Sequence, residues 1–369
     1  MTELKVAFDH GIFSRQKYGG ISRYFIELAS RLLTGAGVQV VVVAPLHINH
    51  YLSRGAVARR TRGLHIPFTF RGLPRLIRLA NRLAEPVAWA GVRADVIHET
   101  YFAEHPTGSA RSRIVTVHDM IYELFPQEFP DAAKIISAKR AAVARADHVI
   151  CVSEKTREDL VRLYGLDRQR TSVVHLGHSF AIGDRDQRAL GQQGRPTLLY
   201  VGVRRGYKNF RTLLHAYAMS EKLKQDFDLI AFGDAPFSPA ELEEQRRLGV
   251  AESVRHQVGD DEALAKRYQT ATVFVYPSLY EGFGIPPLEA MSSGCPVVCS
   301  DRASIPEVVG DAGLYFDPTN VEELRAVLER VATDESLRTQ MRSRGYTRVA
   351  AFSWDACASA TAQIYRNVC

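Results

Sequence analysis

The stretch TVFVYPSLYEGFGIPPLEAMSSGCPVVCS, residues 272–300, contains a strand, a loop, a helix and a second strand in succession. Its ends, TVFVYPS and CPVVCS, are short apolar runs rich in β-branched residues, which favours buried strands. Pro286 and Pro287 suit the first turn of a helix, and we expect that helix to run through LEAMSS and to end at Gly294. The order strand, helix, strand predicts a parallel sheet.

The same alternation continues on both sides of this stretch. Helical patterns such as GGISRYFIELASRLL and DAAKIISAKRAAVARA separate short apolar runs. We therefore expect an α/β protein with two doubly wound domains in series, and ligands in such sheets bind at the carboxyl ends of the strands. The expected strands are KVAF, VQVVVVA, DVIHE, RIVTVHD, HVICVS and SVVHL in the first domain, and TLLYVGV, DLIAFGD, SVRHQVG, TVFVYPS, CPVVCS and GLYF in the second.

Length and composition agree with this organisation. Because a typical domain has about 150 residues, a chain of 369 residues is expected to contain two or three domains. The segment GHSFAIGDRDQRALGQQGRP, residues 177–196, is polar and without periodicity, so it is the best candidate for a linker. The tail from about Val321 onward is predicted to be helical, with an interruption near FSWD.

The five cysteines are odd in number and lie without CxxC spacing. Neither a disulfide framework nor a zinc site is indicated, and a reducing compartment is expected. The N-terminal sequence MTELKVAFDH enters a strand at once, without the pattern of a signal peptide. No apolar run approaches the roughly 18 residues that a membrane-spanning helix needs. We expect a cytoplasmic protein.

The net charge of +6 is concentrated in one basic segment. Residues 54–93 include nine arginines and a single acidic residue, Glu85. Within this segment, RGLPRLIRLANRL predicts a basic amphipathic helix. Its apolar stripe packs on its own domain or docks on an anionic bilayer, and nucleic acid is the third alternative, although no binding module for it is recognisable. The expected stripe comprises Leu73, Leu76, Ile77, Ala80 and Leu83.

Two glycine-bearing loops directly follow expected strands. After KVAFD, Gly19 and Gly20 open a helix, which makes its N-terminal amides accessible to an anion, although a plain turn would use the same glycines. After TLLYVGV, the turn RRGYKNF carries Arg204, Arg205 and Lys208. Arg204 and Lys208 are able to converge on one polyanion, with solvated surface charge as the alternative.

A third loop, within residues 272–300, carries two carboxylates. Glu281 and Glu289 are eight positions apart, but the glycines and prolines between them exclude one continuous helix. We expect the loop to fold back, with Glu289 near a helix N-terminus. Carboxylates accept hydrogen bonds from sugar hydroxyls, whereas helix N-terminal amides, such as those of Leu288 and Glu289, suit phosphate. This combination predicts a nucleotide-sugar site.

Together these motifs resemble those of the retaining glycosyltransferases of family 4, which have the GT-B fold. EGFGIPPLEA resembles the E-x7-E motif of that family, and VGVRRGYKNFRTLLHAYA resembles its donor-diphosphate loop. YGGISRYF matches its N-terminal glycine loop, TVHDM the segment of its catalytic-site histidine and FSWDACASATAQIY its C-terminal helix. The resemblance covers nearly the whole chain and is strongest to bacterial mannosyltransferases that build O-antigen or exopolysaccharide.

The resemblance implies a division of the chain into two Rossmann-like domains that face a central cleft. An acceptor domain would span residues 1–178, a linker 179–196 and a nucleotide-sugar donor domain 197–350. The C-terminal helix, 351–369, would pack back on the N-terminal domain.

The resemblance also implies catalytic and donor-binding residues. Glu289 would bind the ribose of the donor and Glu281 the transferred sugar. Lys208 and Arg204, or alternatively Arg205, would neutralise the departing diphosphate.

On the acceptor side, the resemblance implies that His118, after the strand RIVTV, would face the donor sugar. Asp119 would orient this imidazole or cap the next turn. The remaining donor-binding positions are Gly19, Gly20, Phe283, Gly284, Ile285 and Leu288.

The implied reaction is a front-face, retaining transfer that needs no cofactor and no metal, because cations and helix dipoles take the place of the metal. The pair in GDD, residues 259–261, is weak evidence for a metal site, and base recognition is expected nearby. The implied donor is GDP-mannose, and the acceptor a glycan or a polyprenyl-diphosphate-linked oligosaccharide at the inner face of the plasma membrane. A GT-B nucleotide-sugar epimerase and a catalytically silent nucleotide-sugar-binding subunit of an assembly complex are the alternatives.

Overall fold

The chain divides into two compact units in the computed structural model. We call Met1–Gly177 with Ser353–Cys369 unit 1, and His178–Phe352 unit 2. The linker expected at 179–196 lies for the most part outside the described residues. The residues that the structure describes are 3–35, 37–53, 55–68, 70, 72–180, 183, 195–233 and 235–369.

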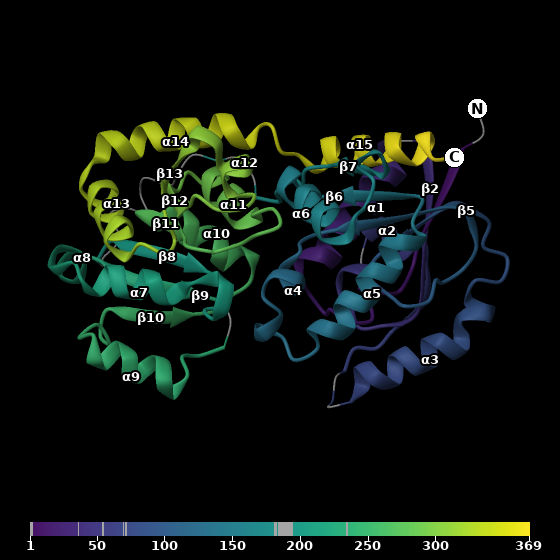
Figure 1. The fold of residues 1–369 in the computed structure, drawn as a ribbon, viewed down its shortest axis with the longest axis horizontal. Coiled ribbons are helices and arrows are strands. Elements are labelled where there is room, and N and C mark those ends of the chain that lie inside the picture. Colours follow the sequence, from purple (N-terminus) through teal and green to yellow (C-terminus); the bar gives the residue numbers. More distant parts are fainter. Residues whose placement is uncertain are drawn as a thin grey trace. The chain divides into compact units, whose positions relative to one another are not determined.

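Unit 1 is built on a seven-stranded sheet in which all paired strands are parallel (Figure 1). The chain starts in the middle of the sheet, runs to one edge and then returns to continue toward the other edge, so the order reverses between β1 and β4. In spatial order the strands are β3 (Thr61–His65), β2 (Val38–His47), β1 (Leu4–Phe8), β4 (Ala94–Glu99), β5 (Ala110–Val117), β6 (His148–Cys151) and β7 (Thr171–Val173).

The sequence predicted six of these strands and missed β3. The sequence of β3, TRGLH, exposes most of its side chains at the edge of the sheet. An edge strand of this kind lacks the alternation of buried and exposed residues on which strand prediction depends.

Helix α15 returns to unit 1 and packs on α1. The Tyr365 hydroxyl lies 2.6 Å from His98 Nδ1 on β4, and the Ser112 hydroxyl donates to the carbonyl of Val368 at 2.6 Å. The helices of unit 1 are α1 (Gly20–Gly35), α2 (Gly55–Ala58), α3 (Leu73–Ala88), α4 (Ile121–Leu124), α5 (Ala132–Arg145), α6 (Glu154–Tyr164) and α15 (Trp354–Asn367), with 3-10 turns η1 (Tyr51–Ser53), η2 (Pro126–Glu128) and η3 (Arg168–Arg170).

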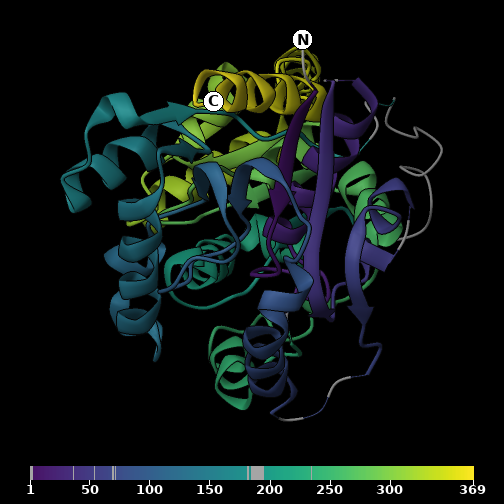
Figure 2. The same cartoon turned by 90° about the vertical axis from the view of Figure 1, so that its right-hand side faces the viewer.

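Helix α3 lies beyond the carboxyl ends of β1 and β2 (Figures 1 and 2). Leu73 and Ile77 anchor it by packing against Ile48. The buried side chain of Asn81 adds polar contacts, because it bonds both the amide and the carbonyl of Leu46, at 2.8 and 3.0 Å. None of the helices that the structure describes, α3 included, has the length and apolar character needed to cross a membrane.

Unit 2 contains a six-stranded parallel sheet, with one strand for each strand that the sequence predicted. Its order reverses between β8 and β11, as the order of unit 1 does between β1 and β4. Both sheets therefore have the strand order of a Rossmann fold. In spatial order the strands are β10 (Val254–Gln257), β9 (Asp228–Phe232), β8 (Thr197–Val201), β11 (Val273–Tyr276), β12 (Val297–Ser300) and β13 (Gly313–Phe316).

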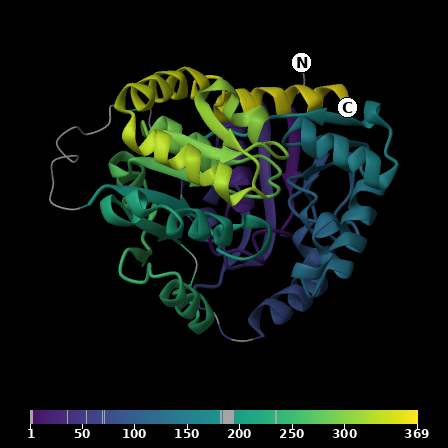
Figure 3. The ribbon, with the colours of Figure 1, turned by 60° about the vertical axis from the view of Figure 1, so that its left-hand side comes forward.

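Helices α7, α8 and α13 share one hydrophobic core with the strands of this sheet, and Figure 3 gives a view of this side. Helix α14 packs against α11. The helices of unit 2 are α7 (Phe210–Ala218), α8 (Glu221–Asp226), α9 (Pro239–Arg247), α10 (Asp261–Thr270), α11 (Ile285–Ser292), α12 (Ile305–Val309), α13 (Val321–Thr333) and α14 (Glu335–Val349), with 3-10 turns η5 (Gly206–Lys208) and η6 (Gly310–Ala312).

The stretch 272–300 forms β11, α11 and β12, as its sequence predicted. Gly284 precedes α11 with φ 112°, and Gly294 follows it with φ 71°. Both are backbone conformations that favour glycine. Because β11 and β12 pair in parallel, the loop 277–284 emerges at the carboxyl edge of the sheet.

Candidate active site

The reversal of strand order in unit 2 brings Lys208 and Glu281 together. Lys208 lies in the turn after β8 and Glu281 in the loop after β11, which is the neighbouring strand. The Lys208 Nζ atom is 2.8 and 3.0 Å from the two carboxylate oxygens of Glu281. Both side chains are largely buried, with 19% and 9% of their surface exposed. A charged pair is thus held at the point where open α/β sheets bind ligands.

Asn209 fixes the two loops relative to each other. It has a left-handed backbone conformation, with φ 57°, which asparagine tolerates better than most residues. Its side-chain amide donates to the carbonyls of Pro277 at 3.0 Å and Pro318 at 2.8 Å. Asn209 was not among the predicted site residues, although an asparagine directly after Lys208 in a strand-to-helix turn is a usable signal.

Ser304 holds the Glu281 loop from the other side. Its hydroxyl lies 2.8 Å from the carbonyl oxygens of both Glu281 and Phe283. Ser304 was also missed, and nothing in its sequence context distinguishes it from an ordinary helix-capping serine.

Arg204 and Lys208 bind different partners. Its guanidinium is buried, donates to Glu241 and to the carbonyl of Ala235 at 2.8 Å each, and lies 4.5 Å above the ring of Phe237. Arg204 therefore ties the turn after β8 to the segment that leads into α9. Arg205 is exposed on the same turn. The sequence left open which of the two contacts a diphosphate, and the contacts of Arg204 favour Arg205.

Glu289 is buried in α11. One of its carboxylate oxygens lies 3.5 Å from the Tyr268 hydroxyl of α10. Burial and the negative charge of Glu289 raise the pKa of Tyr268 well above its usual value, so this hydroxyl stays protonated. The structure thus gives the two glutamates different partners, a lysine for Glu281 and a tyrosine for Glu289.

The sequence predicted that the backbone amides of Leu288 and Glu289 suit a phosphate, but both lie within the hydrogen-bonded part of α11. In an α-helix that begins at Ile285, the N–H groups of Leu288 and Glu289 point back at the carbonyls four residues earlier. Pro286 and Pro287 carry no N–H. Among the other expected donor-binding positions, the amides of Phe283, Gly284 and Ile285 lie outside this intrahelical pattern, and those of Gly284 and Ile285 are next to the helix start.

The acidic pair at 260–261 begins a helix. Asp260 is the N-cap of α10, and its carboxylate accepts from the amide of Ala263 at 3.0 Å. This role accounts for Asp260 without a metal ion. Across the part of the chain that the structure describes, no group of three or more histidine, cysteine or acidic side chains is arranged to hold a metal.

His118 lies at the carboxyl end of β5 in unit 1, and the centre of its ring is 5.1 Å from that of Tyr24. Its Nε2 atom is buried and has no hydrogen-bond partner among the described residues. Burial and the charge of Lys139 lower the pKa of His118 to about 3. The imidazole is therefore neutral near pH 7. Asp119 caps the next turn, because its carboxylate accepts from the amide of Ile121 at 3.0 Å.

A buried ion pair supports the turn after His118. The Lys139 Nζ atom lies 2.8 Å from a carboxylate oxygen of Glu123 and donates to the carbonyl of Asp119 at 3.0 Å. Lys139 is fully buried. The pair was not predicted, because a lysine in a helical pattern does not show from the sequence whether it is buried.

Gly19 and Gly20 stand at the start of α1. A Cβ atom on Gly19 would lie 2.4 Å from the side-chain oxygen of Gln16. That oxygen accepts from the amide of Ser22 at 3.2 Å and so satisfies part of the helix N-terminus. Close packing against Gln16 thus explains Gly19, while Gly20 has open space at its Cα.

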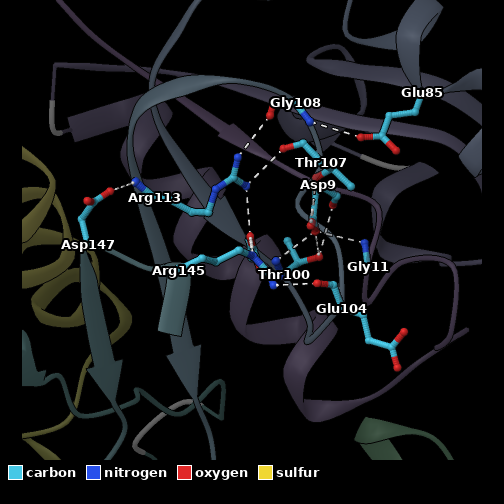
Figure 4. A network of polar contacts seen from close by, with 11 residues as sticks. Asp9, Gly11, Glu85, Thr100, Glu104, Thr107, Gly108, Arg113, Arg145 and Asp147 are labelled. Atoms are coloured by element: carbon cyan, nitrogen blue, oxygen red, sulfur yellow. Dashed lines mark hydrogen bonds and ion pairs between the residues drawn. The ribbon is translucent and has the colours of Figure 1, made fainter. Parts of the chain in front are cut away.

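Polar side chains also gather in unit 1, where the strand order reverses between β1 and β4. Asp9, after β1, accepts hydrogen bonds from the amides of Gly11 and Thr100, at 3.0 and 2.9 Å (Figure 4). Figure 4 also shows Arg113 and Arg145, and both guanidiniums bind the buried carboxylate of Glu99 at the end of β4. These bonds fix the loops that follow the two central strands.

A pocket of about 400 Å³ opens beside Asp9. The Arg15 guanidinium lies 4.9 Å from the centre of the Tyr101 ring on one wall. Burial and the like charges of Arg15 and Arg75 lower the pKa of Arg78, which indicates a concentration of positive charge. The charged lining residues are Asp9, Arg15, Arg78, Arg82, Glu85, Glu104, Asp131 and Lys134.

Two family descriptions match the sequence. The model of the family described as Glycosyl transferases group 1 matches residues 184–348, and the model of Glycosyltransferase Family 4 matches residues 18–180. The O-antigen chain mannosyltransferase B of Escherichia coli is 31% identical over 94% of this chain and 96% of its own length. The chain belongs to the group 1, family 4 glycosyltransferases.

Two further comparisons show lower sequence identity. The O-antigen chain mannosyltransferase RfbU of Salmonella typhimurium is 28% identical over 62% of this chain and 63% of its own length. A sucrose-phosphate synthase structure from Thermosynechococcus elongatus has a TM-score of 0.78 and 21% identity, covering 99% of this glycosyltransferase and 98% of that chain. The two Rossmann-like sheets are thus those of a GT-B fold, as the sequence predicted.

Proposed function

We propose that this glycosyltransferase moves mannose from GDP-mannose, with retention of configuration and without a metal, onto a glycan or a polyprenyl-diphosphate-linked oligosaccharide in bacterial surface polysaccharide synthesis. The observation that carries the proposal is the Lys208–Glu281 pair at the strand reversal of unit 2. The names of the two mannosyltransferase relatives support the sugar and the pathway.

The donor side is expected to work through charge. Lys208 neutralises negative charge on the diphosphate as it leaves, and Glu281 accepts hydrogen bonds from hydroxyls of the sugar. Arg205, exposed on the same turn, supplies a second cation. Glu289 accepts from the ribose hydroxyls. The Gly284 and Ile285 amides bind phosphate.

On the acceptor side, the pocket beside Asp9 suits a phosphorylated glycan. Arg15, Arg78 and Arg82 provide cations for a diphosphate, while the carboxylates in the same lining accept from sugar hydroxyls. The ring of Tyr101 offers an apolar surface for a sugar face. His118, which is neutral, is able to hydrogen-bond a hydroxyl without adding charge.

A panel of nucleotide sugars tests the donor assignment. We expect GDP-mannose to bind more tightly than GDP-glucose and UDP-glucose, and to be hydrolysed slowly in the absence of acceptor to GDP and α-mannose, with or without EDTA. Calorimetry measures binding, and NMR identifies the anomer first released. Release of an epimerised nucleotide sugar would identify an epimerase. Binding without any hydrolysis or transfer would identify a silent subunit.

Helix α3 has an exposed apolar ridge that suits a membrane surface. Leu76, Leu79, Leu83 and Val87 are between 55% and 80% exposed and follow one another at helical spacing. The expected stripe is therefore split, because Leu73 and Ile77 are buried whereas Leu76 and Leu83 face outward. The buried face packs on unit 1, as one of the three interpretations expects, and the exposed face is free to serve one of the other two.

We therefore include in the proposal that the ridge docks on the inner face of the plasma membrane. Arg75, Arg78 and Arg82 line the side of α3 next to the ridge, and they are exposed. Apolar residues beside arginines complement a bilayer with anionic headgroups. Phe68 and Phe70, whose rings stack with centres 6.4 Å apart, extend the apolar surface in the preceding segment.

Replacing Leu79 and Leu83 together with serine is expected to lower partition onto phosphatidylglycerol vesicles about tenfold or more, because two exposed leucines lose their apolar contact with lipid. Vesicle sedimentation measures the partition. Leu242→Ser is the matched control, since Leu242 is an exposed leucine of α9 in unit 2. Donor hydrolysis should not change in either variant. Equal partition of the wild type and the double variant would show that the ridge does not contact the membrane.

A further inference from the structure

A second pocket of unit 1, of about 410 Å³, is lined by cations and, among the described residues, by no acidic one. His118 follows the carboxyl end of β5, whereas this pocket lies near the opposite ends of the strands. Lys5 and Gln39 are near the starts of β1 and β2, and Arg60 and Arg93 directly precede β3 and β4. The pocket is therefore at the amino ends of the strands. We call it the basic pocket, and its cationic lining residues are Lys5, Arg59, Arg60, Arg62 and Arg93.

Four of these cations are not neutralised by the part of the chain that the structure describes. Among the residues that the structure describes, the side chains of Lys5, Arg59, Arg60 and Arg93 form no ion pair. Arg62 donates to the carbonyl of Ala90 at 3.1 Å, which holds its guanidinium at the pocket without removing its charge.

Two carboxylates near the basic pocket accept hydrogen bonds from neutral N–H groups of residues that line it. Asp95 accepts from the backbone amide of Lys5 at 2.8 Å, and Glu3 accepts from the side-chain amide of Gln39 at 2.6 Å. Neither carboxylate lines the pocket. Five like charges around one hollow repel one another, and a bound anion removes that repulsion.

We propose that the basic pocket is a second binding site, for a ligand that carries two or more phosphate groups. Phosphate oxygens accept several hydrogen bonds at once, and the planar guanidinium of arginine binds them with two donors. Five cations exceed what one phosphate balances, because one phosphate carries about 1.5 to 2 negative charges at pH 7. The ligand is either a soluble diphosphate or a set of phospholipid headgroups, and the site is independent of the donor loops of unit 2.

Calorimetry with pyrophosphate tests the soluble source. We expect the double substitution Arg59→Gln, Arg60→Gln to weaken one class of pyrophosphate sites about tenfold or more, because each lost cation removes charge-assisted hydrogen bonds. Lys208→Ala should leave that class unchanged. The matched control is Lys222→Gln with Arg330→Gln, which removes two exposed cations of unit 2.

Vesicles test the lipid source with the same variants. Phosphatidylcholine vesicles with and without phosphatidylglycerol are sedimented with each protein. A loss of binding that is confined to the Arg59, Arg60 variant, for pyrophosphate or for the anionic vesicles, supports the proposal and identifies the source. The proposal is overturned if that variant binds both probes like the wild type, if the control variant loses as much, or if only Lys208→Ala loses pyrophosphate binding. Thermal unfolding confirms that all variants are folded.

Discussion

Replacing Lys208 with alanine is expected to lower the single-turnover rate at saturating donor by about 100- to 1000-fold. Departure of the nucleoside diphosphate adds negative charge to the oxygen nearest the sugar, and in the proposed mechanism the Lys208 ammonium, which pairs with Glu281, stabilises that charge. An interaction that strengthens in the transition state changes turnover more than binding. Donor affinity, measured by calorimetry with the intact nucleotide sugar, should change less than the rate.

Controls must separate this effect from damage to the fold, since removing the lysine leaves the largely buried Glu281 carboxylate without its cation. The double variant Lys208→Met, Glu281→Gln removes both charges, so we expect it to recover thermal stability but not turnover. Arg204→Ala is expected to reduce the free energy of unfolding, because Arg204 binds Glu241 and the carbonyl of Ala235. If Lys208→Ala binds donor poorly but turns over normally once saturated, Lys208 only holds the donor.

Replacing Glu289 with alanine is expected to weaken binding of GDP about 100-fold or more. If the carboxylate accepts from both ribose hydroxyls, two charge-assisted hydrogen bonds are lost together, at about 1.5 to 3 kcal/mol each. Calorimetry with GDP measures the effect directly. An unchanged dissociation constant would refute the ribose assignment.

Two variants sharpen the test of Glu289. Glu289→Gln keeps one acceptor oxygen in nearly the same volume, so an intermediate affinity is expected. Tyr268→Phe removes only the hydroxyl that lies 3.5 Å from the carboxylate. Because that contact is long, GDP affinity should change little. A large loss in Tyr268→Phe would mean that the tyrosine, and not the ribose, determines the position of Glu289.

Local patterns in the sequence determined most of the fold. The prolines and glycines of the stretch 272–300 mark where α11 begins and ends, and the apolar runs mark the strands of both sheets. These signals are short-range, because each depends on the backbone preference of a few neighbouring residues. The edge strand β3 gave no such signal and was missed.

Contacts between residues that are far apart in the sequence were harder to predict. Lys208 and Glu281 were both predicted as site residues, but their pairing follows from the adjacency of β8 and β11. The contacts of Arg204 could not be predicted, because a sequence does not show which of two adjacent arginines turns inward. Lys139 was missed for a similar reason, since burial of a lysine depends on an acidic partner sixteen residues away, Glu123.

The return of α15 to unit 1 has a consequence for synthesis on the ribosome. Its buried residues, including Trp354 and Tyr365, are translated only after the whole of unit 2. At about 5 to 20 residues per second, the nascent unit 1 waits roughly 10 to 40 seconds for its last helix. During that interval the surface of α1 that α15 covers is open, and His98 lacks its tyrosine partner. A nascent chain arrested before Ser353 should therefore present an apolar surface to chaperones.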